Sequence, residues 1–198
     1  SDGSSNSNKI SKIADNKLDN TKQSGIIEFE KGVTEEVQNA SNTGFEAMQE
    51  MFGKFGKITT ISRVGVLNSK NSTDYGVFYD YTGELLLRFA NKKNALSEHA
   101  QKAQKMKKSD KWSSAHPLHT FRHEIGHAIQ LEHRLNDPLW DSKLSEIRKI
   151  MSKVDNSDVS LYAFDSIDEF ISECIAESMT KKARAISKKV INIILGGD

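Results

Sequence analysis

His123 and His127 stand four residues apart, with Glu124 directly after the first histidine. In a helix, side chains at i and i+4 lie on one face, so the two imidazoles can bind one metal ion. Glu124 lies about 100° further round, where its carboxylate can reach a water on the metal without being a ligand. The spacing therefore predicts a helix whose histidine face borders a cleft and can hold a metal ion, with Glu124 beside it.

The residues around this pair fit an amphipathic helix that is buried through its back. Four apolar residues recur on the side opposite the histidines: Phe121, Ile125, Ala128 and Ile129. Pro117 suits the first turn of a helix, because the amide that proline lacks has no partner there. Pro138 lies just beyond the expected stop at Asn136 and Asp137. We expect a helix over residues 117–135; two histidines on an exposed helix face are the alternative.

Catalytic zinc sites use three protein ligands and leave one position to water, so a third ligand is needed further along the chain. Glu169, Glu173 and Glu177 recur at i, i+4 and i+8 and would share one face of a helix. Apolar residues occupy another face: Phe170, Cys174, Ile175 and Met179. The simpler interpretation of this pattern is a solvated acidic face on an amphipathic helix.

The segment His-Glu-x-x-His, followed by a tyrosine, six residues and Glu-Phe-x-x-Glu, resembles zincin metallopeptidases whose third ligand is a glutamate. Examples are the catalytic domain of anthrax lethal factor and, less closely, the Pro-Pro endopeptidases. The resemblance covers residues 120–179. It implies that Glu169 is the third ligand to Zn²⁺, that Tyr162 assists the transition state, and that Glu173 orients a ligating histidine. It also implies a peptide or protein substrate.

His133 competes with Glu169 for the role of third ligand. It follows His127 by six residues, as in the metzincin peptidases, and Met151 could serve as their methionine turn. That pattern requires glycine at position 130, where the helix ends and the chain turns back. Gln130 favours a continuing helix and leaves His133 about 240° round from His127, away from the metal. We therefore prefer Glu169 and expect His133 at the surface.

The other histidines and the cysteine carry weaker signals. His99 and His116 are expected at the surface. His119 precedes His123 by one turn, so it either lines the cleft or faces solvent. Cys174 is the only cysteine and stands between acidic residues on an apolar helix face. We expect a buried thiol that is not reactive.

Length and composition suit one globular domain: 198 residues, of which 36% are hydrophobic and 28% charged. We expect a flexible polar leader over residues 1–24 and one domain over residues 25–198. The net charge of +1 gives no reason to expect a nucleic-acid partner, and no apolar run is long enough for a membrane span. The compartment and the oligomeric state stay open, although the resemblance favours a secreted or a phage- or toxin-associated bacterial protein.

The region before the histidine pair predicts a helix, a strand and a hairpin. Apolar periodicity favours a helix over residues 33–55, broken near residues 42–44. Residues 57–67 are rich in β-branched side chains and predict a strand. Residues 75–90 predict a hairpin with Thr82 and Gly83 at its turn.

Two stretches near the predicted cleft have alternative interpretations. The second hairpin arm, residues 85–90, is either the edge strand that binds an extended substrate or an interior strand. Residues 91–112 carry seven lysines. We expect them to form a solvated, mobile connector; the alternative is a basic rim that attracts acidic substrate segments.

Together these features predict an α+β zincin-like domain with an N-terminal helix, a small mixed sheet, an active-site helix and a C-terminal helical subdomain. The expected function is zinc-dependent hydrolysis of internal peptide bonds. His123, His127 and Glu169 are the expected zinc ligands. Glu124 is the expected general base for the attacking water, and Tyr162 the donor to the oxyanion. The alternatives are the metzincin-type peptidase and a non-catalytic zincin-like interaction or virion module.

Overall fold

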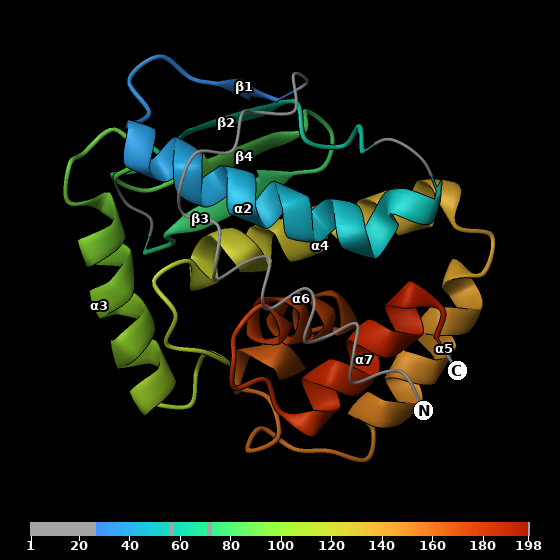
Figure 1. The fold of residues 1–198 in the computed structure, drawn as a ribbon. Coiled ribbons are helices and arrows are strands. Elements are labelled where there is room, and N and C mark those ends of the chain that lie inside the picture. The colour runs from blue at the N-terminus through green and yellow to red at the C-terminus, as the bar shows by residue number, and fades with distance from the viewer. Residues whose placement is uncertain (1–26, 56–57, 71–72, 198) are drawn as a thin grey trace.

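The computed structural model describes residues 27–55, 58–70 and 73–197, which form an α+β fold with a small mixed sheet, as expected (Figure 1). The expected leader over residues 1–24 lies outside the described residues. None of the described helices combines the length and the apolar character that a bilayer span requires.

Four short strands form the sheet in the order β1-β2-β4-β3. Their bounds are Glu28–Phe29 for β1, Arg63–Val66 for β2, Gly76–Tyr79 for β3 and Glu84–Leu87 for β4. β2 pairs in parallel with both β1 and β4, whereas β3 and β4 are antiparallel. The predicted hairpin is therefore confirmed. Its second arm is the interior strand β4, and β3 forms the edge of the sheet.

Helix α4 (His119–Asn136) lies between the sheet and the C-terminal helices (Figure 1). Its predicted apolar stripe is confirmed, since all four side chains are buried: Phe121, Ile125, Ala128 and Ile129. The helix begins two residues later than expected. Pro117 stands in the preceding turn, where the His119 amide donates to the His116 carbonyl at 2.9 Å. The histidine pair thus lies in a helix that is anchored through its apolar side.

Helix α2 (Glu35–Phe52) is continuous and passes into a short 3₁₀ segment, Gly53–Phe55. Thr34 caps it by accepting the Val37 amide through its hydroxyl. The predicted break near residues 42–44 is wrong, because Gly44 is a packing position rather than a turn. A Cβ at Gly44 would lie 2.4 Å from the ring of Phe121, so glycine permits the close approach of α2 and α4.

The strand predicted over residues 57–67 begins only at Arg63. The Ser62 amide already donates to the Gly83 carbonyl at 2.9 Å, but the backbone two and three residues earlier bonds to a side chain instead. The amides of Thr59 and Thr60 donate to the buried Glu132 carboxylate of α4 at 2.5 and 2.6 Å. This contact joins the chain before β2 to the central helix.

Helix α3 (Ala95–Lys108) occupies most of the stretch expected to be a mobile connector, so that prediction is wrong. Ala95, His99 and Ala103 recur every four residues and are buried against the body of the domain. His99 is therefore not at the surface. Its Nε2 lies 2.7 Å from the Arg88 carbonyl oxygen, and burial lowers the pKa of its imidazole.

The C-terminal part is helical, as expected, and contains α5 (Trp140–Met151), α6 (Ile167–Ser178) and α7 (Ala185–Leu195). Helix α6 packs directly on α4. A Cβ at Gly126 would lie 2.8 Å from the Cα of Ser172, so only glycine allows this spacing. Cys174 is buried on α6, as predicted, and burial raises the pKa of its thiol.

Candidate metal and catalytic site

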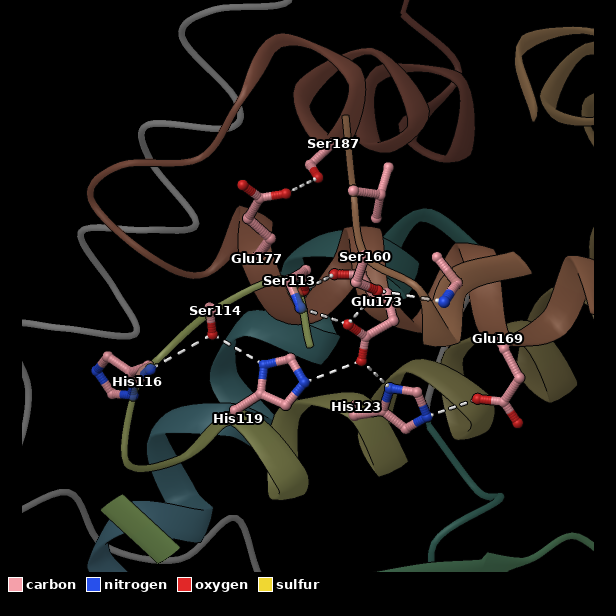
Figure 2. A network of polar contacts seen from close by, with 12 residues as sticks. Ser113, Ser114, His116, His119, His123, Ser160, Glu169, Glu173, Glu177 and Ser187 are labelled. Carbon is pink, nitrogen blue, oxygen red and sulfur yellow. Dashed lines mark hydrogen bonds and ion pairs between the residues drawn. The ribbon is translucent and has the colours of Figure 1, made fainter. Parts of the chain in front are cut away.

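Three side chains from α4 and α6 each bring one atom to a common point. Nε2 of His123 lies 2.8 Å from Oε2 of Glu169 and 3.2 Å from Nε2 of His127. His127 Nε2 lies 3.4 Å from the same carboxylate oxygen. Figure 2 shows the ring of His123 and the carboxylate of Glu169 facing each other. The two histidines and the downstream glutamate thus meet where a single ion could contact all three.

The donor set and its distances fit a metal ion. Ligand atoms about 2.0–2.1 Å from a tetrahedral Zn²⁺ lie about 3.3 Å from one another, near the observed separations. Oε2 of Glu169 is buried, and Nε2 of His123 and Nε2 of His127 lie 2.8 and 3.4 Å from it. A cation between these three atoms would be held by one carboxylate oxygen and two imidazole nitrogens. Two imidazoles and one carboxylate form a known zinc ligand set.

The first turn of α6 places the carboxylate. Ser166 is the N-cap of this helix, and its Oγ accepts the amide hydrogen of Glu169 at 3.1 Å. The cap fixes where the helix begins and so sets the direction of the glutamate side chain. The close packing at Gly126 then brings this turn against α4 beside the histidines.

Glu173 lies one turn further along α6 and is fully buried. Its Oε1 accepts hydrogen bonds from Nδ1 of His123 at 2.8 Å and Nε2 of His119 at 2.9 Å (Figure 2). Its Oε2 accepts from the Ser113 amide at 2.6 Å and the Ser160 hydroxyl at 2.9 Å. Burial would raise the pKa of this carboxyl, but the two histidines hold it well below its usual range. Glu173 therefore fixes the ring of His123.

His119 is the member of this network that the sequence left undecided. It is buried, and its Nδ1 lies 2.8 Å from the Ser114 hydroxyl oxygen. The Trp112 ring stacks on the His119 ring, with 4.7 Å between the ring centroids. His119 belongs to the lining of the cleft and does not face solvent. Sequence reasoning missed Ser113 and Ser160 altogether, since nothing in their local sequence marks them as partners of Glu173.

Glu124 lies beside the three converging atoms but is not one of them, as predicted from its place on the helix. Burial raises the pKa of its carboxyl, although the charges of His123 and His127 oppose this shift. The edge strand passes close to it, since a Cβ at Gly76 would lie 3.1 Å from the Glu124 Cγ. A carboxylate that lines the cleft at this place can accept a proton from a water beside the converging atoms.

Tyr162 lies in the 3₁₀ segment Tyr162–Phe164, and its ring centroid is 5.4 Å from that of His123. Its side chain is partly exposed toward the cleft that Glu124 also lines. Burial raises the pKa of the phenol, and the carboxylates of Glu169 and Glu124 raise it further. The hydroxyl therefore stays protonated and can donate a hydrogen bond.

His133 takes no part in this cluster, and its expected surface position is wrong. The side chain is buried, with Nδ1 2.8 Å from Oδ2 of Asp137, and its ring stacks on Trp140 at 4.9 Å. Continuous helix through Gln130 carries it to this separate location, as the sequence argument against the metzincin ligand required. His116 is half-buried, and its Nδ1 accepts the Leu118 amide at 3.1 Å.

The alternative of a solvated acidic face on α6 is also wrong. Besides Glu173, Glu177 is buried, where it accepts hydrogen bonds from the Arg184 guanidinium at 2.6 Å and from the Ser187 hydroxyl (Figure 2). Glu173 and Glu177 therefore lie in the interior, and Glu169, at the start of the row, is only partly buried.

Two hollows of about 350 and 380 Å³ meet at the site, and both are lined by Asp74, Gly76, Glu124 and Tyr162. The first, the α3 hollow, extends to these residues: Lys102, Met106, Lys111, Trp112 and Leu161. The second, the β3 hollow, extends to these: Phe78, Asp80, His127, Gln130 and Arg134. They form a cleft along the edge strand β3 with Glu124 and Tyr162 at its middle.

No protein-family model, curated protein or solved structure matches this chain in comparisons with known proteins.

Proposed function

We propose that this protein is a zinc-dependent endopeptidase. The observation that carries the proposal is the convergence of His123, His127 and Glu169 on one point, with Glu124 beside them in an open cleft. The resemblance to the zincins with a glutamate ligand supports the same assignment of ligands. A protein that only bound metal would have no need of a carboxylate that lines the cleft beside the ligands.

In the proposed reaction, a zinc ion held by the three ligands would act as a Lewis acid on the scissile carbonyl and on water. Glu124 accepts the proton of the attacking water and later transfers it to the leaving amine. Tyr162 donates its O–H to the carbonyl oxygen as negative charge develops there. Glu173 holds His123 in one orientation throughout.

The shape of the cleft supports cleavage within a chain rather than at its end. The hollows extend to both sides of Glu124, so substrate residues can lie on either side of the scissile bond. Strand β3 is at the sheet edge, where a backbone in extended form can add to the ladder. Such backbone contacts favour unfolded or exposed segments of a peptide or protein.

Glu124→Gln tests the proposal most directly. The variant keeps every proposed ligand, so zinc measured by elemental analysis should stay near one ion per chain. Cleavage of a fluorogenic peptide library should nearly disappear, because the proton acceptor is gone. Glu146→Gln, at an exposed position of α5, is the matched control and should cleave normally.

Two outcomes would contradict the proposal. Near-normal cleavage by Glu124→Gln would remove Glu124 as the base. Zinc bound by the wild-type protein without any cleavage would favour the non-catalytic interaction or virion module instead.

A further inference from the structure

The two hollows of the cleft differ in the charge that surrounds them. Two lysines line the α3 hollow: Lys102, on α3, and Lys111, in the turn that follows this helix. Lys105 stands on the exposed side of α3. None of these three side chains forms an ion pair within the described ranges of the chain. They are therefore available to an acidic group that enters from solvent.

These cations are close enough to repel one another. Lys102 lies over the ring of Tyr75, 5.0 Å from its centroid, on the wall of the hollow. Burial lowers the pKa of Lys102, and repulsion from Lys105 and Lys111 lowers it further. An incoming carboxylate would relieve this repulsion, which is the mark of a site complementary to an anion.

Three carboxylates, those of Asp74, Glu124 and Asp165, also line this hollow. Asp74 attracts Lys102, but the combined effect of the surrounding groups on the lysine remains repulsive. Asp165 follows the 3₁₀ segment that carries Tyr162 and lies outside α3. The cations come from α3 and from the turn after it, with Met106 beside Lys102 in the lining.

The direction of strand β3 decides which part of a peptide would meet these lysines. β3 runs from Gly76, where the hollows join, toward Asp80 in the β3 hollow. A peptide that pairs antiparallel with this edge runs the opposite way, and antiparallel pairing is the more stable kind. Its residues C-terminal to the scissile bond would then lie in the α3 hollow.

We propose that the substrate is a peptide segment with acidic residues on the C-terminal side of the cleaved bond, bound by Lys102, Lys105 and Lys111. This inference rests on the proposed endopeptidase function. It extends that function from backbone recognition, which is tolerant of sequence, to a stated charge preference.

The test uses three fluorescence-quenched peptide libraries with the zinc-loaded protein. In one library the C-terminal half is rich in Asp and Glu, in the second it is rich in Lys, and in the third the acidic residues are moved to the N-terminal half. We expect the first library to be cleaved about tenfold faster than the others at low ionic strength, and the advantage to fall in 0.5 M salt.

A charge-matched pair of variants locates the effect. Lys102→Gln/Lys105→Gln/Lys111→Gln should keep its zinc, because no proposed ligand is changed, and should lose the preference, with its rate on the first library falling about tenfold toward the rates on the other two. The control removes three exposed lysines outside the cleft, Lys149, Lys153 and Lys189, and should keep the preference. Equal cleavage of all libraries by the wild-type protein would overturn the inference. A preference that survives in the variant lacking Lys102, Lys105 and Lys111 would also overturn it.

Binding of labelled peptides, measured by fluorescence anisotropy, separates this inference from the proposed function. Lysine-dependent binding of the first library without cleavage would uphold the inference and remove the endopeptidase. Cleavage without a charge preference would uphold the endopeptidase function and overturn the inference of an acidic substrate. Tighter binding of the third library than of the first would overturn the stated direction.

Discussion

Glu173 holds the ring of His123 from behind, with Oε1 2.8 Å from Nδ1, while Nε2 of the same ring faces Glu169. A proton kept on Nδ1 by this hydrogen bond leaves the lone pair on Nε2 free for a metal ion. Because His119 donates to the same Oε1 atom, the position of Glu173 depends on a second imidazole. The orientation of this proposed ligand is thus set by groups that lie outside the three converging atoms.

Removing His119 should therefore weaken metal binding. We expect His119→Leu to lower zinc affinity about tenfold, within the range typical for partners of ligating histidines. His119→Gln can still donate to Glu173 and should lose less. Competition with a chelator gives the affinities, and the visible spectrum of the cobalt-substituted protein reports ligand geometry.

His99→Leu is the matched control for this prediction. His99 is another buried histidine, but it lies on α3 and is bonded to the Arg88 carbonyl rather than to Glu173. Its loss should reduce stability without changing zinc affinity. Equal affinities for His119→Leu and wild type would show that His119 only fills space.

Tyr162→Phe should reduce kcat about 100-fold or more, as expected for the loss of one donor to the oxyanion. KM and zinc content should change little, because the ring remains and no ligand is removed. Tyr81→Phe is the control, since Tyr81 is 80% exposed on the hairpin turn. An unchanged kcat for Tyr162→Phe would leave the tyrosine with a packing role.

The helix periodicity in the sequence was sufficient to predict α4 and its buried stripe. The relation of His123, Glu124 and His127 follows from helix geometry alone. The choice of Glu169 needed the family resemblance, because a glutamate at i, i+4 spacing is equally compatible with a solvated helix face. Only the packing of α6 on α4 at Gly126 brings this side chain to the histidines.

Other features depend on partners that are distant in sequence. Glu173 accepts from Ser113, which is 60 residues away, so no local pattern marks that pair. The interior position of β4 depends on its parallel pairing with β2, and the hairpin sequence alone does not indicate the order of the strands in the sheet. Helix α3 was not predicted because its buried stripe consists of two alanines and His99, which give a weak apolar periodicity in a stretch rich in lysine.

The buried His133 predicts a pH dependence of stability. Burial lowers its pKa in the folded state, although the bond to Asp137 opposes this, and Lys143 lowers it further. The folded protein then binds fewer protons at His133 than the unfolded chain, whose imidazole titrates near pH 6.5. The stability contributed by the neutral ring is therefore present above about pH 6.5 and is lost as the pH falls.

His133→Asn tests this dependence, since asparagine is neutral at every relevant pH and can still donate to Asp137. The free energy of unfolding should be lower for the variant at pH 7.5, and the gap to wild type should narrow toward pH 5. Denaturant titrations at several pH values, with chelator present in both samples, give this difference. A constant gap would show that His133 does not titrate differently on folding.

The last prediction separates the two schemes for the third zinc ligand. Glu169→Gln should lower zinc affinity by at least about 100-fold, more than the loss expected for an outer partner, because it replaces the anionic carboxylate ligand with a neutral amide. Asp168→Asn, the neighbouring carboxylate in the β3 hollow, should bind zinc normally and controls for the change in charge. His133→Asn should also keep its zinc, because its ring lies against Trp140 and Asp137, away from the cluster. Zinc titrations of the three variants under folded conditions decide the matter: loss of affinity in His133→Asn with none in Glu169→Gln would exclude Glu169 as the ligand and restore the metzincin scheme.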